Sequence, residues 1–204
     1  MSRYRGPRVK KMRALGLDLP GLSRKSIERR PQPPGQHGAN RRNKLSDYAR
    51  QLREKQKLRL NYGLSERQFM RLMEAAKRST MPSGQKLGEL LERRLDNVVF
   101  RSGIAATIPA ARQLVNHGHT LVNGRKVNIA SYQVSEGDVV TLRNRSRNLP
   151  TVLESISGPG SMKPEWLDFD PSTRTATVSE LPDWGSVPFP VDFQLVVEFY
   201  SKRL

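Results

Sequence analysis

The sequence predicts an α+β protein with a basic extended arm, a small helical domain and a compact module built from one helix and short strands. Three observations support this fold class. Lys and Arg are concentrated toward the amino terminus, apolar residues recur at helical spacing between residues 46 and 98, and an Asn-Gly turn follows a short helix near residue 123. At 204 residues, the chain is long enough for one or two domains.

Charge is graded along the chain, whose formal net charge is +17 at pH 7. Lys and Arg outnumber Asp and Glu by 18 to 4 in residues 1–62 and by 14 to 7 in residues 63–147, whereas residues 148–204 have 4 against 8. A strongly basic protein is expected to bind a polyanion. The gradient predicts that the binding surface lies on the first three quarters of the chain.

Composition also argues against several classes of protein. The chain has no apolar run long enough to cross a membrane and no signal-peptide pattern, so we expect a soluble, intracellular protein without a membrane partner. It has no cysteine and only three scattered histidines, so we expect no metal and no cofactor. Asp168 and Asp170 flank a turn, and neither a nucleophile motif nor a phosphate-binding loop is present. We therefore predict a binding protein and not an enzyme.

Residues 1–45 form the predicted arm. They are rich in Arg, Lys, Pro and Gly and have no sustained apolar period, so alone they cannot bury enough surface to offset the entropy cost of ordering. Two interpretations stay open, a solvated tail and an extension that becomes ordered on a phosphate backbone. The cations that recur closely enough to meet several phosphates are Arg3, Arg5, Arg8, Lys10, Lys11 and Arg13.

Residues 46–92 form the predicted helical domain. Ser46 is suited to cap a first helix, which Gly63 ends, and Ser65 begins a second helix. A third helix follows the turn at residues 81–85, and its apolar residues keep the 3.6-residue period through Val98. Three successive helices imply a small bundle.

Residues 93–157 contain the predicted α+β module. Thr107 caps a helix that accepts Pro109 in its first turn and ends at Gly118. One side of this helix is apolar. The other side is expected to present Arg112, Gln113, Asn116 and His119.

A hairpin follows that helix. Asn123 and Gly124 are suited to its two turn positions, which need positive φ, and they place Arg125 and Lys126 beside the turn. After the turn, Val127 and Ile129 alternate in a way that predicts a strand pointing toward the core, to which Val140 and Leu142 return.

A Gly- and Pro-rich break leads to residues 158–187, a predicted strand-rich extension, and then to residues 188–204. The β-branched residues of VDFQLVVEFYSKRL favour a strand, whereas Asp192 as a cap and the terminal Lys202 and Arg203 favour a helix. Residue patterns leave this choice open. The segment is too apolar to stay free, so it is expected to dock on the helical domain.

The segment ARQLVNHGHTLVNGRKVNIASYQVSEGDVV closely resembles the RNA-binding domain of bacterial and plastid small-subunit ribosomal protein four, a module shared with several RNA-modifying enzymes. The resemblance covers most of the chain through MSRYRGPRVKK, LPGLSRK, PPGQHG, REKQKLRLNYGLSERQF, LLERRLDNVVFR and LVVEFYSK. It implies that the carboxyl-terminal segment is a helix that completes the helical domain. It also implies that the RNA-binding module, a helix with small twisted strands, is inserted before that segment.

The same resemblance implies a structural component of the small ribosomal subunit. Members of the family bind small-subunit ribosomal RNA at a junction in its 5′ domain and help to nucleate assembly. With small-subunit protein five they contribute to translational accuracy, and they lie near the path by which messenger RNA enters. The amino-terminal segment MSRYRGPRVKK is most similar to the cyanobacterial and chloroplast branch, which implies a ribosome of the bacterial cytoplasm or of the plastid stroma.

Position by position, the resemblance implies an RNA-contacting set in both the arm and the module. The set is Arg3, Arg5, Arg8, Lys10, Arg13, Gln36, His37, Arg112, Gln113, Asn116, His117, His119, Asn123 and Arg125. Two departures from the family pattern are present. The four zinc-binding cysteines of some relatives are absent, so no metal is implied, and Thr120 stands where an apolar residue is common.

Two other functions share some of these features. An RNA-modifying enzyme with the same module, such as a pseudouridine synthase, would need a further catalytic domain for which this chain has no room. A nonspecific nucleic-acid packaging protein would share the charge but would not require the hairpin module or the apolar tail.

Overall fold

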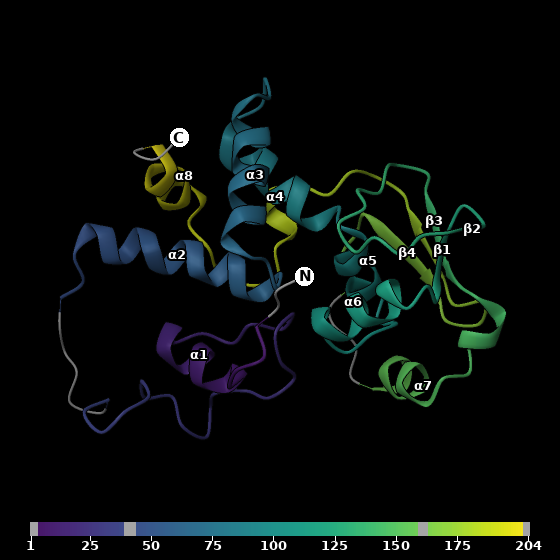
Figure 1. Ribbon diagram of the computed structural model, residues 1–204, viewed down its shortest axis with the longest axis horizontal. Helices are drawn as coiled ribbons and strands as arrows, with labels where there is room; N and C mark the ends of the chain where they lie inside the picture. Colours follow the sequence, from purple (N-terminus) through teal and green to yellow (C-terminus); the bar gives the residue numbers. More distant parts are fainter. Residues whose placement is uncertain (1–3, 39–43, 159–162, 202–204) are drawn as a thin grey trace. The chain divides into compact units, whose positions relative to one another are not determined.

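A computed structural model describes residues 4–38, 44–158 and 163–201, which fold into two compact units (Figure 1). The first unit combines the described residues up to Leu87 with those from Phe189 onward, and the second unit runs from Gly88 to Pro188. Helices form the first unit, and helices with one sheet form the second. The α+β fold class predicted from the sequence is confirmed.

Serine caps define the helices of the first unit where the sequence predicts them. The side chain of Ser46 accepts a hydrogen bond from the Ala49 N–H, and Ser65 forms a reciprocal capping box with Gln68. The helices of this unit are α1 (Arg8–Leu15), α2 (Asp47–Asn61), α3 (Glu66–Lys77), the first half of α4 (Ser83–Glu92) and α8 (Phe193–Ser201).

The carboxyl-terminal segment is a helix, α8, and it packs on α2. Glu66 of α3 joins the two helices, because its Oε1 accepts hydrogen bonds from Lys55 Nζ at 2.8 Å and from the Tyr200 hydroxyl at 2.7 Å. The Lys55 ammonium also lies 4.6 Å from the centre of the Phe199 ring, within cation–π range. Packing thus decides the choice between helix and strand that residue patterns left open.

Glu66 makes the stability of the first unit dependent on pH. Burial by itself raises the pKa of Glu66, but hydrogen bonds from Lys55 and Tyr200, with the charges of Lys55 and Arg59, outweigh it and leave this pKa below its ordinary value of 4.5. A carboxyl whose pKa is lowered by folding stabilises the folded state at pH values above its pKa in the unfolded chain. That contribution is lost as the pH falls through the folded pKa.

We expect Glu66→Gln to flatten the acid side of the stability profile. In urea unfolding from about pH 6 to about pH 3, the variant should lose less of its free energy of unfolding than the parent protein does below pH 4.5. Glu28→Gln, at an exposed carboxyl of the same unit, is the control and should keep the parent's slope. Equal slopes for the parent and Glu66→Gln would rule out this role.

The described part of the arm packs against α2. Its buried apolar side chains are Met12, Leu19 and Leu22. The Gly21 N–H donates to Oδ1 of Asn61 at 2.9 Å, at the end of α2. The arm is thus hydrogen-bonded to α2 and buries apolar side chains, so residues 4–38 do not form a fully solvated extension.

The second unit contains a five-stranded sheet among its described residues, with strand order β2-β1-β3-β5-β4 and every neighbouring pair antiparallel. Its strands are β1 (Thr120–Val122), β2 (Arg125–Lys126), β3 (Val139–Leu142), β4 (Leu167–Asp170) and β5 (Thr175–Val178). The strands expected in the extension are present as β4 and β5. Val140 of β3 pairs with Ala176 of β5, so these strands continue the sheet of the module.

Besides the second half of α4, three helices and two single turns of 3₁₀ helix accompany the sheet in the described part of this unit. They are α5 (Leu95–Arg101), α6 (Ile108–Asn116), η1 (Asn144–Ser146), α7 (Pro150–Ser157) and η2 (Trp184–Ser186). Thr107 caps α6 by accepting a hydrogen bond from the Ala110 N–H, as predicted. Helix α7 was not predicted from the sequence.

The third predicted helix is two helices, α4 and α5, so its expected continuity through Val98 is wrong. Arg94 between them is extended, with φ −65° and ψ 135°, and it forms an isolated bridge with Gln133. The Leu95 N–H donates to the Tyr132 carbonyl, and the Val134 N–H donates to the Arg93 carbonyl, each at 2.9 Å. Hydrogen bonds to a distant segment therefore replace helical ones at this point.

The hairpin turn is confirmed, but the strand after it is shorter than predicted. Asn123 and Gly124 have φ values of 49° and 75°, whereas β2 covers only two residues. Ile129, predicted to point toward the core, is 58% exposed. Thr120 is fully buried, and its hydroxyl donates to the Val127 carbonyl at 3.0 Å, so the polar group at this position is satisfied.

Candidate nucleic-acid interface

The carboxyl-terminal edge of α6 presents polar side chains to solvent. Gln113, Asn116 and His117 are exposed, while Ala111 and Val115 on the opposite side are fully buried. Gly118, with φ 71°, ends the helix and turns the chain into β1. The amphipathic pattern therefore orients three of the predicted contact residues outward.

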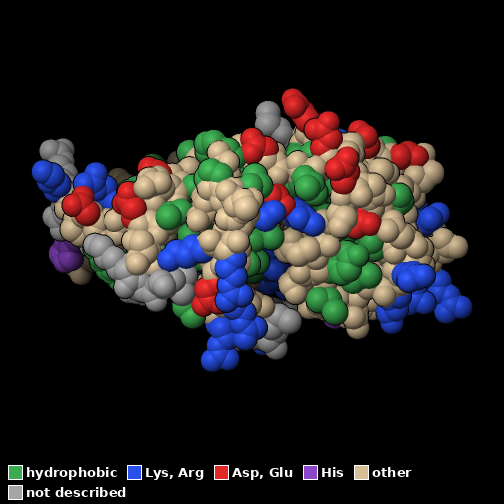
Figure 2. Space-filling view, turned by 90° about the horizontal axis from the view of Figure 1, so that it is seen from above, with side chains coloured by type: hydrophobic (Ala, Val, Ile, Leu, Met, Phe, Trp, Pro, Cys, Tyr) green, Lys and Arg blue, Asp and Glu red, His purple; other side chains and the backbone are tan. Residues whose placement is uncertain are grey.

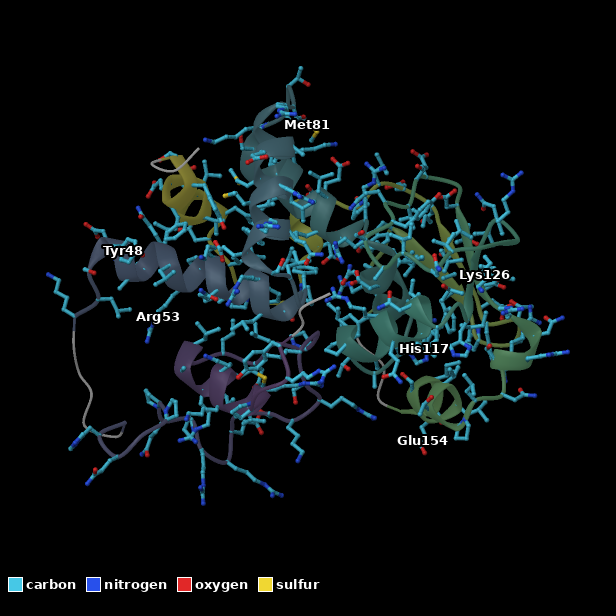
Figure 3. The ribbon with its side chains drawn as sticks, viewed as in Figure 1. Tyr48, Arg53, Met81, His117, Lys126 and Glu154 are labelled. Atoms are coloured by element: carbon cyan, nitrogen blue, oxygen red, sulfur yellow. The ribbon has the colours of Figure 1, made fainter. Side chains whose placement is uncertain are left out.

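The hairpin brings a cation to this edge. A Cβ on Gly118 would clash with the end of the Lys126 side chain, so Lys126 lies across the backbone at the end of α6. Figure 3 labels His117 at the end of this helix and Lys126 on the hairpin. Arg125 is also exposed. Lys126 was not in the predicted set, although its place directly after Arg125 beside an Asn-Gly turn was the signal that could have included it.

His119 connects the same edge to η1. Its Nδ1 lies 2.9 Å from the Ser146 hydroxyl, and its carbonyl accepts a hydrogen bond from the Arg143 N–H at 2.9 Å. The ring of His119 is centred 6.0 Å from that of His117. The edge of α6, the Lys126 side chain of the hairpin and η1 therefore form one polar, basic cluster, which we call the basic face.

Arg112 does not belong to the exposed side of α6, and its predicted placement there is wrong. It is 9% exposed, and its Nε donates to Oδ2 of Asp96 at 2.9 Å. Arg94 donates to both oxygens of the same carboxylate, at 3.0 and 2.8 Å. Asp96 is fully buried, so two arginines converge on one carboxylate between α5 and α6. The place of Arg112 in the α6 sequence could not predict this ion pair, because Asp96 lies sixteen residues earlier in the chain.

Asn123 is exposed but engaged in the fold. Its side-chain amide donates to Oδ1 of Asp138 at 2.8 Å, and its side-chain oxygen accepts from the Val139 N–H at 2.9 Å. Asn123 therefore shapes the hairpin that carries Arg125 and Lys126.

The predicted contacts of the arm lie in the first unit. Arg5 and Lys10 are exposed, and Arg13 Nε donates to the Gln32 carbonyl at 3.0 Å. Arg8 donates to the Leu22 carbonyl at 3.4 Å. The side chains of Arg8 and Arg13 therefore hydrogen-bond to carbonyl groups within the arm itself. Arg3 lies outside the described residues.

Gln36 and His37 are exposed on the turn of the PPGQHG segment. Gly35 has φ 107°, and a Cβ on Gly38 would clash with the Pro33 carbonyl oxygen. Both glycines are therefore required by the backbone, and the turn holds Gln36 and His37 outward.

Acidic side chains of the second unit gather on a different side from its basic end (Figure 2). Exposed carboxylates in or next to β4 and β5 include Glu165, Asp168, Asp170 and Glu180. Hydrogen bonds from Ser172 and Thr173 lower the pKa of Asp170 to about 2, so it stays ionised at neutral pH. A polyanion is therefore favoured at the basic face and disfavoured at the β4 side.

Two further observations concern residues 4–38, 44–158 and 163–201. Every helix there is too short or too polar to span a bilayer. The same residues hold no group of three His, Asp or Glu arranged to bind a metal ion.

A small helix-and-hairpin module with an exposed basic face places the chain in the class of RNA-binding proteins. Comparison with known families gives two matches that follow one another, the ribosomal protein S4/S9 N-terminal domain at residues 3–92 and the S4 domain at residues 93–140. Small ribosomal subunit protein uS4 of Methylobacillus flagellatus is 57% identical, and that of Crocosphaera subtropica, a cyanobacterium, is 54% identical. Protein uS4B of Nitrosomonas europaea is 55% identical, and each alignment covers all of both chains. The chain belongs to the uS4 family of small ribosomal subunit proteins.

Membership of this family confirms the resemblance stated from the sequence motifs, including similarity to cyanobacterial members. The chain is a structural protein of the small ribosomal subunit and not an enzyme. An RNA-modifying enzyme is thereby excluded.

Proposed function

We propose that the chain binds small-subunit ribosomal RNA directly, at a junction in the 5′ domain, and that this binding helps to nucleate assembly of the subunit. In the assembled particle it contacts protein five, contributes with it to translational accuracy, and lies near the path by which messenger RNA enters. It does so in a ribosome of the bacterial cytoplasm, with the plastid stroma as the alternative compartment.

The basic face of the second unit is the observation that carries this proposal. Its amide, imidazole and cationic groups come from α6, the β1–β2 hairpin and η1, which hydrogen bonds and close packing hold together. All of its side chains up to Lys126 lie within the segment that matches the S4 domain. Membership of a ribosomal family supports ribosomal RNA as the polyanion that binds this face.

Binding works through phosphate neutralisation and shape. Lys and Arg release condensed counterions when they meet phosphates, whereas the amides of Gln113 and Asn116 can accept or donate hydrogen bonds at the backbone, 2′-hydroxyls or unpaired bases. Most of these contacts set position and few of them distinguish bases. The protein therefore recognises a folded RNA junction mainly by its geometry.

The test is a competition between two nucleic acids. Full-length protein is titrated onto a junction fragment of the 5′ domain and onto duplex DNA of equal length, in the same salt, and we expect the junction to bind roughly a hundredfold or more tightly. Equal affinities would favour a nonspecific packaging protein. Cross-linking of the chain within a purified small subunit tests the proposed contacts with protein five.

Arg125→Ala is expected to weaken junction binding severalfold while the melting temperature of the free protein stays within about 1 °C of the parent value. The reason is that the Arg125 side chain is exposed to solvent on β2. Lys163→Ala removes the same charge beside β4 and is the control, with RNA affinity unchanged. A large fall in melting temperature for Arg125→Ala would show that the side chain is structural.

A further inference from the structure

We propose that Arg143 and Arg145 form a second RNA-backbone contact, which η1 holds against the edge of α6. This proposal rests on the proposed function and deepens it, because it extends the basic face past residue 140, where the match to the S4 domain ends. The ligand is a run of RNA phosphates adjacent to those met by His117 and Lys126.

Two hydrogen bonds fasten η1 to the RNA-facing edge. The backbone of Arg143 donates to the His119 carbonyl at 2.9 Å, and three residues later the Ser146 hydroxyl lies 2.9 Å from Nδ1 of His119. Ser146 is 5% exposed, so this contact is sheltered from water. The segment that carries Arg143 and Arg145 is therefore fixed relative to His119 before any RNA binds.

The arginines of this segment divide into two roles. Arg147 is half-buried, and its Nε donates to the Leu142 carbonyl at 3.3 Å, which closes the turn on itself. Arg143 and Arg145 are exposed, and within the described residues neither forms a salt bridge. Two cations held on a fixed turn with no carboxylate to neutralise them are suited to bind phosphates, to which a guanidinium can donate two hydrogen bonds at once.

Ser146 acts as a positioning residue in this arrangement. Its hydroxyl contacts His119 and does not need to touch RNA, so its effect on binding passes through the placement of the turn that carries Arg143 and Arg145. Substitution at Ser146 should therefore matter only while Arg143 and Arg145 are present.

The experiment measures junction-RNA affinity of the full chain as a function of salt concentration. Arg143→Gln with Arg145→Gln is expected to weaken binding about tenfold or more and to reduce the slope of log K against log salt by roughly 1.4 to 1.8, the value for two lost phosphate contacts. Both positions are exposed, so the melting temperature should be unchanged.

A matched control removes the same charge beside β4, the strand at one edge of the sheet. Lys163→Gln with Arg174→Gln, one before and one after β4, lowers the net charge of the second unit equally and should leave the slope unaltered. Equal loss in both double variants would overturn the proposal in favour of a general charge effect. An unchanged affinity in Arg143→Gln/Arg145→Gln would overturn it as well.

A double-mutant cycle tests the positioning role. Ser146→Ala is expected to weaken binding about threefold in the parent protein, to have no effect in the Arg143→Gln/Arg145→Gln background, and to be rescued by Ser146→Thr. The same loss in both backgrounds would show that Ser146 acts elsewhere. If the parent protein does not prefer the junction RNA over duplex DNA, the proposed function itself fails. If the parent protein prefers the junction but the Arg143 and Arg145 substitutions leave its affinity unchanged, only this inference is refuted.

Discussion

The affinity of the full chain for junction RNA is expected to fall about a thousandfold or more as salt rises from 50 to 200 mM. The arm and the basic face together offer enough exposed cations for roughly 8 phosphate contacts, each of which releases condensed counterions on binding. Exposed members of this set include Arg5, Lys10, Arg125, Lys126, Arg143 and Arg145. The effect is large because every phosphate contact weakens with rising salt and the losses in binding free energy add up.

Equilibrium titrations by fluorescence anisotropy, at four or more salt concentrations in this range, measure the slope directly. Circular dichroism at each concentration is the control that the protein stays folded. A flat response would contradict binding by phosphate neutralisation and would direct attention to base-specific contacts, which depend little on salt.

Asp96→Ala should cause the largest loss of stability of any single substitution considered for the second unit, about 3 to 5 kcal/mol in the free energy of unfolding. Asp96 is fully buried and accepts hydrogen bonds from both Arg94 and Arg112, which are themselves buried. Removing the carboxylate leaves two neighbouring guanidinium groups without their shared counter-ion. Their mutual repulsion and loss of hydration then oppose folding.

Urea unfolding in the absence of RNA measures this effect. Asp168→Ala, at an exposed carboxylate on β4 of the same unit, is the matched control and should change stability by less than about 0.5 kcal/mol. Arg112→Ala should be destabilising but less so, because Asp96 keeps Arg94 as a partner. A change below about 1 kcal/mol for Asp96→Ala would mean that the buried cluster relaxes or admits water.

Arg112 shows why a contact set based on sequence positions alone can include a buried side chain. It stands beside Gln113 on α6 in a stretch that resembles an RNA-binding module, yet its side chain turns inward to Asp96. Lys126 shows the converse, since only the close approach of the hairpin to Gly118 brings it to the edge of α6. RNA contacts by the remaining members of the set stay predictions, which the titrations above test.

Sequence by itself determined the features that depend on neighbouring residues. Ser46, Ser65 and Thr107 begin helices because their hydroxyls satisfy N–H groups within the next turn, and Asn123 with Gly124 forms a hairpin because both tolerate positive φ. The graded charge and the long ordered motifs likewise pointed to RNA and to the family.

Tertiary structure alone decided the features that depend on distant residues. The helix breaks at Arg94 because Tyr132 and Val134 form backbone hydrogen bonds with the residues on either side of it, although the leucine period continues across the break. The arm is held to the end of α2 by a hydrogen bond to Asn61, and α8 is a helix because α2 and α3 accept its aromatic face. Partners far away in the chain set the local conformation in each case, and a local pattern contains no information about them.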